Sequence, residues 1–159
     1  MTKAVSVSLR PATLDDLEFL SASHRSGHAA IEAERGGELD ILLRGRPEPI
    51  EDSFRTTMDD ADTRVLVGEV DGLAVGYLVL ANVDLRSGNQ IARVTDMWVH
   101  PNARGVGVGG ALMTKAMAIA GEQGCTGIDA RALPGDRPTK NFFESFGLVA
   151  RTIEVHKSL

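Results

Sequence analysis

The sequence predicts an α/β domain built on a mixed, mostly antiparallel central sheet. Its 159 residues are enough for one domain with a sizeable core and too few for two ordinary ones. Two β-branched runs at 63–70 and 73–85, joined by Asp71 and Gly72, predict an antiparallel hairpin. Segments with helical apolar spacing alternate with the predicted strands. We expect six to seven strands flanked by about four helices.

The first half of the chain is predicted to begin with a strand and to continue with helices. Residues 4–13 alternate in strand fashion up to Pro11, and Thr13 with the acidic residues after it is typical of a helix start. From 27 to 62 a helical pattern is interrupted by glycines and prolines. We therefore expect two or three short helices in this region rather than one long helix.

The second half returns to strands after the hairpin. Residues 90–99 predict another strand, and apolar residues then recur at helical spacing over 108–120. A strand at 125–133, a short helix at 137–147 and a final strand at 148–159 complete the order.

The composition excludes several classes of partner. Seventeen basic and 22 acidic side chains give a net charge of -5, which provides no general basic surface for nucleic acid or an anionic membrane. No apolar run approaches the ~20 residues of a membrane span, and the N-terminus lacks the apolar core of a signal peptide. The single Cys125 excludes an internal disulfide and a thiolate metal cage. We expect a cytoplasmic protein.

The stretch VHPNARGVGVGG at 99–110 contains four glycines between a predicted strand and a predicted helix. Glycines let a backbone approach a ligand closely, and the start of a helix presents free N–H groups with a partial positive charge. Both features suit phosphate oxygens, and Arg104 can add a charge-assisted contact. A tightly packed glycine turn without a ligand is the alternative.

The same stretch also spells the G-x-G-x-x-G of dinucleotide-binding enzymes, through Gly105, Gly107 and Gly110, with Asp129 about twenty residues further on. That motif belongs to a parallel sheet with several βαβ units, but only 49 residues follow Gly110. A dinucleotide enzyme is therefore the less favoured interpretation.

The segment VTDMWVHPNARGVGVGGALMTKAM resembles the acetyl-CoA-binding segment of the GCN5-related N-acetyltransferase (GNAT) family, whose signature is Arg/Gln-x-x-Gly-x-Gly/Ala. Arg104, Gly107 and Gly109 match it. The order of predicted elements agrees over nearly the whole chain, and ARALPGDRPTKNFFESFGL resembles the C-terminal segment of the family. The resemblance implies a single N-acetyltransferase domain over 1–159, with a GNAT-like acyl-CoA N-acyltransferase fold whose sheet is splayed between strands four and five.

The resemblance also implies acetyl-CoA as co-substrate and no metal. The pantetheine arm would pair with strand four, the pyrophosphate would bind the glycine loop, and the helix at 137–147 would flank the thioester. The cofactor-binding residues implied in this way are Met97, Trp98, Val99, Arg104, Gly105, Val106, Gly107, Val108, Gly109, Gly110, Asn141 and Phe143.

The implied activity moves the acetyl group of acetyl-CoA to a primary amine by direct attack in a ternary complex. A lysine-like amine has a pKa near ~10.4, so some group must accept its proton. Asp96 is the expected base or water-positioning group, with a structural role as the alternative. The backbone amide of Met97 would stabilise the oxyanion. Glu32 and Glu34 would bind a cationic substrate, or form an exposed helix face.

Two departures from the family pattern motivate a second function. Phe143 stands where relatives commonly carry a proton-donating tyrosine, and Thr95 stands where spermidine/spermine-type relatives carry a glutamate. A non-catalytic acetyl-CoA sensor is therefore the alternative to an enzyme. The acceptor, a small molecule or a peptide or protein amine, and a homodimeric state are left open.

Two histidines, His24 and His28, lie four residues apart in the first predicted helix. No third ligand stands at a recognisable metal-binding spacing. We expect a pair on the helix surface rather than a metal site.

Overall fold

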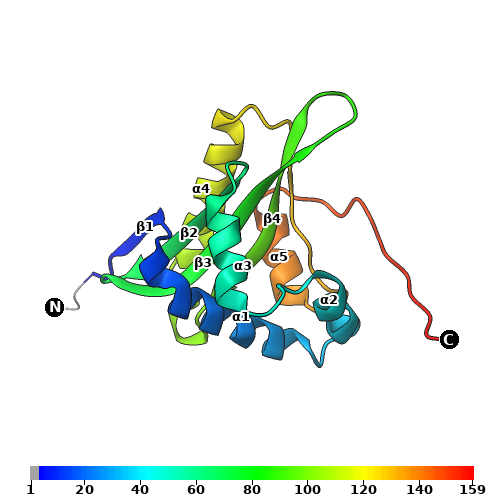
Figure 1. Ribbon diagram of the computed structural model, residues 1–159, viewed down its shortest axis with the longest axis horizontal. Helices are drawn as coiled ribbons and strands as arrows, with labels where there is room; N and C mark the ends of the chain where they lie inside the picture. The colour runs from blue at the N-terminus through cyan, green and yellow to red at the C-terminus, as the bar shows by residue number, and fades with distance from the viewer. Residues whose placement is uncertain (1–3) are drawn as a thin grey trace.

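The computed structural model describes residues 4–159 as a five-stranded sheet with helices on both faces (Figure 1). The strands follow each other in the order β1-β2-β3-β4-β5, antiparallel except for the parallel β4 and β5. The strands are β1 (Val7–Pro11), β2 (Thr63–Val70), β3 (Leu73–Asp84), β4 (Gln90–Val99) and β5 (Ile128–Asp129). The helices are α1 (Leu17–Ile31), α2 (Gly37–Arg44), α3 (Ile50–Asp59), α4 (Val108–Glu122) and α5 (Arg137–Ser145), with 3-10 turns at Leu14–Asp16 and Pro101–Ala103.

Two hydrophobic cores lie on opposite faces of the sheet. One joins α4 and α5 to alternate residues of β2, β3 and β4, with Leu78, Leu112 and Met113 fully buried. The other joins α1 and α3 to the opposite residues of the same strands, with Leu20 and Phe54 fully buried. Because side chains of a strand alternate between faces, the sheet contributes to both cores.

The predicted hairpin between β2 and β3 is confirmed. Asp71 has φ 48° and Gly72 has φ 82°, so both turn residues adopt positive φ. This is the backbone that a two-residue hairpin with a type I′ turn requires, and Asp-Gly is a favoured sequence for it.

The predicted short helices between 27 and 62 are also confirmed as α2 and α3, but α1 continues through Gly27 to Ile31. A Cβ at Gly27 would lie 3.3 Å from Cδ1 of Trp98 on β4. Glycine at this position therefore lets α1 approach the sheet closely, which explains why it does not end the helix.

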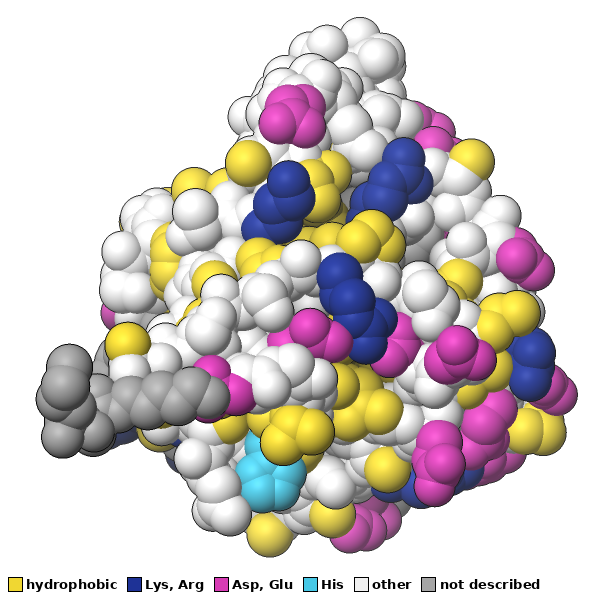
Figure 2. Space-filling model, turned by 90° about the vertical axis from the view of Figure 1, so that its left-hand side faces the viewer, with side chains coloured by type: hydrophobic (Ala, Val, Ile, Leu, Met, Phe, Trp, Pro, Cys, Tyr) yellow, Lys and Arg dark blue, Asp and Glu magenta, His cyan; other side chains and the backbone are white. Residues whose placement is uncertain are grey.

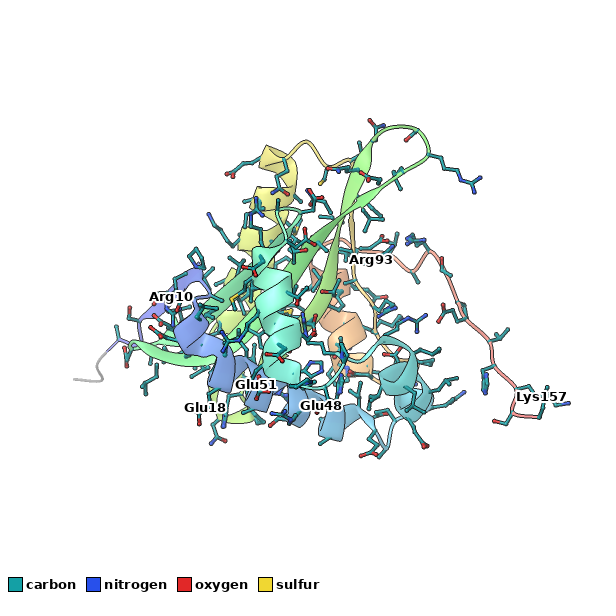
Figure 3. The ribbon with its side chains drawn as sticks, in the orientation of Figure 1. Arg10, Glu18, Glu48, Glu51, Arg93 and Lys157 are labelled. Carbon is teal, nitrogen blue, oxygen red and sulfur yellow. The ribbon has the colours of Figure 1, made fainter. Side chains whose placement is uncertain are left out.

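The sheet is splayed between its fourth and fifth strands, as expected. Only Ala92 with Ile128 and Arg93 with Asp129 are paired, so the strand predicted at 125–133 is reduced to two residues. Arg93 lies where β5 and the C-terminal segment pass β4 (Figure 3), and its Nη2 is 3.4 Å from Oδ2 of Asp129. Beyond this point β4 has no strand neighbour on that side among residues 4–159.

The final strand predicted at 148–159 does not form. The segment runs away from the body of the protein (Figure 1), and Val149, Ile153 and Val155 are 82 to 92% exposed. Arg151 pairs with Asp129, and Glu154 pairs with Arg44 of α2. A β5 of two residues offers too short a ladder for a further strand to pair with, so the described chain has five strands instead of six to seven. Its five α-helices are close to the expected number of about four.

Candidate functional site

The glycine loop opens the N-terminus of α4 to solvent. Gly105 has φ 85°, and Gly107, the N-cap of α4, has φ 97°. A Cβ at either position would meet nothing within 4 Å, so the backbone conformation rather than crowding requires glycine. No side chain among residues 4–159 caps α4, and its first-turn N–H groups have no intrahelical acceptor. The loop therefore presents free donors and the positive end of a helix dipole to a ligand.

The end of β4 lies beside this loop. Nε of Arg104 donates to the carbonyl of Val99 at 3.2 Å. A Cβ at Gly109 would lie 3.6 Å from Cε of Met97 and 3.5 Å from Cε2 of Phe142 on α5. The structure thus brings together the loop, the unpaired end of β4 and α5, which sequence reasoning assigned to one cofactor.

A β-bulge at Thr95 decides which face of the sheet Asp96 reaches. Val79 of β3 pairs with Asp96, whereas the next residue, Leu80, pairs with Val94, so Thr95 is the extra residue. A bulge of one residue reverses the alternation of side chains along the strand. Val94 belongs to the core beneath α4, while Asp96, like its partner Val79, faces α1 and α3.

Asp96 is the centre of a nearly buried polar network. Its side chain is 13% exposed. Nη2 of Arg46 donates to Oδ2 at 3.0 Å and Nε donates to Oδ1 at 3.3 Å, while the Thr95 hydroxyl donates to Oδ2 at 3.0 Å. Nδ1 of His24 lies 3.4 Å from Oδ1. Both carboxylate oxygens therefore have cationic or hydrogen-bonding partners.

The partners of Asp96 control its ionisation. Burial by itself raises the pKa of a carboxyl group, but hydrogen bonds from His24, Arg46 and Thr95, together with the charge of Arg46, outweigh it and lower the pKa of Asp96 to about 2. The carboxylate is therefore ionised at neutral pH and is a weak proton acceptor.

Arg46, from the connection between α2 and α3, is the residue that sequence reasoning missed. Its Nη1 also donates to the hydroxyls of Ser53 at 3.2 Å and Thr57 at 2.8 Å, and its Cζ lies 4.0 Å from the centre of the Phe54 ring. An arginine between Gly45 and Pro47 carries no sequence signal for a contact fifty residues away. Only the packing of α3 on the sheet brings it to Asp96.

The expectation that the histidines form a surface pair is wrong for His24. Its side chain is 4% exposed, because this face of α1 packs on the sheet. Nδ1 lies 3.5 Å from the hydroxyl oxygen of Tyr77 on β3, and the ring centre lies 3.9 Å from that of His28. Nε2 is buried and has no hydrogen-bond partner within residues 4–159.

A cavity of about 370 Å³ adjoins this network. Its walls come from α1, α2 and the start of α3, and they include His24, His28, Glu32, Arg46 and Glu48. The labelled Glu48 lies near the junction of these helices (Figure 3). The cavity therefore borders His24 and Arg46, which contact Asp96, and is lined by no residue of the glycine loop.

A larger cavity of about 630 Å³ lies elsewhere, between β1, β2, the end of α3 and α4. Figure 2 views the β1 side of the molecule, where hydrophobic side chains lie between lysines and arginines. This cavity is lined by no residue of the Asp96 network, whereas the smaller cavity is lined by His24 and Arg46, so size alone does not identify the site.

The other residues expected at the site lie in different surroundings. Glu32 lines the smaller cavity, whereas the carboxylate of Glu34 is directed at Gly135, where a Cβ would lie 2.8 Å from its Oε2. Asn141 is exposed on α5. Phe143 is 8% exposed and packs in the core beneath α4. No group of three metal-ligating side chains occurs between residues 4 and 159, and no helix there is long and apolar enough to cross a membrane.

Comparison with known sequences agrees with this arrangement. The acetyltransferase (GNAT) family matches residues 17–148 of the chain, from the start of α1 to just beyond the end of α5. An uncharacterized N-acetyltransferase from Archaeoglobus fulgidus is 26% identical over 119 residues, which cover 74% of this chain and 76% of that protein.

Solved structures share the fold at low sequence identity. A mutant of the BH1408 protein from Bacillus halodurans has a TM-score of 0.82 at 23% identity, covering 96% of this chain and 99% of its own. A ribosomal-protein-alanine N-acetyltransferase from Brucella melitensis has a TM-score of 0.69 at 18% identity, covering 98% and 99%. An aminoglycoside acetyltransferase from an uncultured soil sample, solved with sisomicin, has a TM-score of 0.71 at 16% identity, covering 98% and 97%.

Proposed function

Because this chain belongs to the acetyltransferase (GNAT) family, we propose that it transfers the acetyl group of acetyl-CoA to a primary amine by direct attack in a ternary complex. The observation that carries the proposal is the open glycine loop at the start of α4, next to the unpaired end of β4. A pyrophosphate needs the first feature and an extended pantetheine arm needs the second.

In this proposal the amides from Arg104 to Gly110 bind the pyrophosphate, and Met97, Trp98 and Val99 pair with the pantetheine. The thioester then lies near Met97, whose backbone amide donates to the oxyanion of the tetrahedral intermediate. The support is that β4 beyond Arg93 has no strand on its outer side among the described residues.

Of the two roles expected for Asp96, base and positioning group, the proposal retains the positioning group. A carboxyl with a pKa of about 2 accepts a proton poorly at neutral pH, and Arg46 donates to both of its oxygens. Its charge and fixed orientation instead suit it to hold a neighbouring group or water beside the thioester.

The proposed acceptor is an amine that enters from the α1 and α2 side, where Glu32 and Glu48 line the smaller cavity. Glu48 is paired with Arg25 at 3.4 Å, so Glu32 is the carboxylate proposed to bind the ammonium group. Two structures of the same fold come from proteins named for amine substrates, a ribosomal-protein alanine and an aminoglycoside. A small-molecule amine or a peptide or protein amine is accordingly the substrate class.

The test is release of CoA thiol from acetyl-CoA with a panel of amines and terminal-amine peptides, alongside calorimetry with CoA. We expect CoA binding and thiol release with at least one amine. CoA binding without thiol release from any amine would support the second candidate, an acetyl-CoA sensor, which is favoured by the buried Phe143 where relatives commonly carry a tyrosine. Absence of CoA binding would contradict both functions.

A further inference from the structure

We propose that His24 is the group that accepts the proton of the amine, through its Nε2, and that Asp96 is the residue that positions it. The proposal rests on the acetyl transfer proposed above and names the base of that reaction. It is based on the burial of His24, the contacts of its two ring nitrogens and the cavity beside it.

The first observation is an unpartnered nitrogen. His24 is 96% buried, yet its Nε2 has no hydrogen-bond partner within residues 4–159. Leaving a buried polar atom unpaired costs about 1–3 kcal/mol, and buried polar groups in proteins nearly always have a partner. A substrate nitrogen or a water held in the adjoining cavity, which His24 lines, would supply that partner.

The second observation indicates which nitrogen holds the lone pair. Nδ1 lies 3.4 Å from Oδ1 of Asp96, and an ionised carboxylate can only accept a hydrogen bond. The contact is attractive only if Nδ1 carries the proton, so the neutral ring has its lone pair on Nε2. Arg46 keeps the carboxylate ionised and oriented. The Tyr77 hydroxyl, whose pKa is raised by burial, remains protonated at 3.5 Å from Nδ1.

The third observation is location. Asp96 directly precedes Met97, where the thioester is proposed to lie. His24 contacts Asp96 and therefore lies close to the strand on which the reaction is proposed to occur. The ionisable groups that face His24 are Tyr77, Asp96, Arg46 and, on its own helix, His28. A neutral imidazole with a free lone pair is the side chain that proteins use most often as a general base.

The proposed step balances as follows. Nε2 of His24 takes one proton from the ammonium group, and the free amine forms a C–N bond with the thioester carbonyl carbon. Collapse of the tetrahedral intermediate breaks the C–S bond. The second N–H proton of the attacking nitrogen goes to the departing thiolate, and His24 releases its proton to solvent. One amide, one thiol and one proton are produced from each ammonium and acetyl-CoA.

His28 provides a matched control on the same helix. It lines the same cavity, and its ring lies beside that of His24 at 58° to it, but no carboxylate of residues 4–159 lies within 4.0 Å of either of its nitrogens. Burial, and secondarily the charge of His24, lower the pKa of His28. If any imidazole in the cavity could serve, the two histidines would be equivalent, whereas the proposal requires only the one positioned by Asp96.

The first test does not depend on activity. Nitrogen NMR of ¹⁵N-histidine-labelled protein reports which nitrogen of His24 is protonated, with His24→Gln assigning the signal. We expect the Nδ1–H tautomer in the wild type and a loss of that preference in Asp96→Asn. An Nε2–H tautomer in the wild type would overturn the proposal, because the base would then have no lone pair at the cavity.

The second test compares kcat/KM of His24→Asn and His28→Asn across pH, using the best amine of the panel. Asparagine keeps an N–H toward Asp96 while removing the base, so the protein should fold and bind CoA normally. We expect His24→Asn to lose about 10²- to 10⁴-fold at pH 7, less as pH rises and free amine accumulates, and His28→Asn to lose less than about tenfold.

The outcomes separate this inference from the proposed function. Wild-type transfer with unchanged activity in a folded His24→Asn, or with a loss that is the same at every pH, would refute His24 alone. A wild type that binds acetyl-CoA but acetylates no amine would refute the proposed function and, with it, a catalytic use of His24.

Discussion

The two sides of the candidate site are built in opposite ways. On the cofactor side, Gly105 and Gly107 leave open backbone at the start of α4, and the ligand would meet N–H groups rather than side chains. On the acceptor side, His24, Arg46 and Asp96 form a dense side-chain network beneath α1 and α3. Atoms added on the cofactor side would occupy the space of the ligand. Atoms removed on the acceptor side would break the side-chain network.

The largest expected effect is a loss of CoA affinity caused by a substitution on the cofactor side. Gly107→Glu should lower CoA affinity by about 100-fold or more, because it places a side chain and a negative charge in the open space above the helix N-terminus. Calorimetry measures the affinity. Gly124→Glu is the matched control, since Gly124 also has positive φ, at 75°, and open space around it, but lies at the other end of α4.

Both substitutions force a non-glycine residue into the left-handed region, which costs roughly 1–2 kcal/mol. Equal losses of stability with different CoA affinities would therefore isolate the ligand effect. A folded Gly107→Glu protein that binds CoA as the wild type does would remove the phosphate-loop assignment.

The difference between the two sides explains how much the sequence could predict. The glycine loop and the Asp71-Gly72 turn are local, since neighbouring residues determine both the conformation and the exposed backbone. The acceptor side depends on residues from four parts of the chain, namely α1, the connection between α2 and α3, β3 and β4. The bulge at Thr95 is decisive, because without it the alternation of β4 would direct Asp96 toward α4 and away from His24.

The errors in the predicted strands have a related cause. Residues 125–133 and 148–159 have strand-like sequences, yet only Ile128 and Asp129 pair with β4. A strand requires a partner at a suitable distance as well as a suitable sequence, and the splay of the sheet removes that partner. The same splay that shortened the predicted strands leaves β4 open for a cofactor.

The next largest effect tests the acceptor side. Asp96→Asn should lower the free energy of unfolding by about 3–5 kcal/mol, because the Arg46 side chain, only 10% exposed, loses its counter-charge. Arg46→Met should cost a similar amount by leaving Asp96 unpaired, and denaturant unfolding of the double variant should show less than the sum of the two losses. CoA affinity should hardly change in either variant.

A loss below about 1 kcal/mol in Asp96→Asn would show that Arg46 and the Asp96 carboxylate interact only weakly. Asp96 would then be free to accept a proton itself, as the sequence alone suggested, and the assignment to His24 would be weakened.

A smaller effect is expected from acid. The pKa of Asp96 falls from 3.8 unfolded to about 2 folded, so its ionisation contributes about 2 kcal/mol of stability that is fully present above pH ~4. This contribution should disappear as pH falls from about 4 to about 2. Urea unfolding between pH 5 and 2 should therefore show a shallower loss in Asp96→Asn than in the wild type, and parallel curves would contradict the shift.

The smallest effect concerns Phe143. A tyrosine there could protonate the departing thiolate only if its hydroxyl reached the thioester, but Phe143 is 8% exposed in the core beneath α4. A thiol of pKa ~8.5 leaves tolerably without an acid near neutrality. We therefore expect Phe143→Tyr to change kcat by less than about tenfold, in thiol-release assays on protein whose folding is checked by circular dichroism.

Phe142→Tyr is the control, because Phe142 is the aromatic neighbour that faces Gly109 of the loop. A rise of several orders of magnitude in Phe143→Tyr alone would mean that the natural protein lacks its acid, and would favour acetyl-CoA sensing over catalysis.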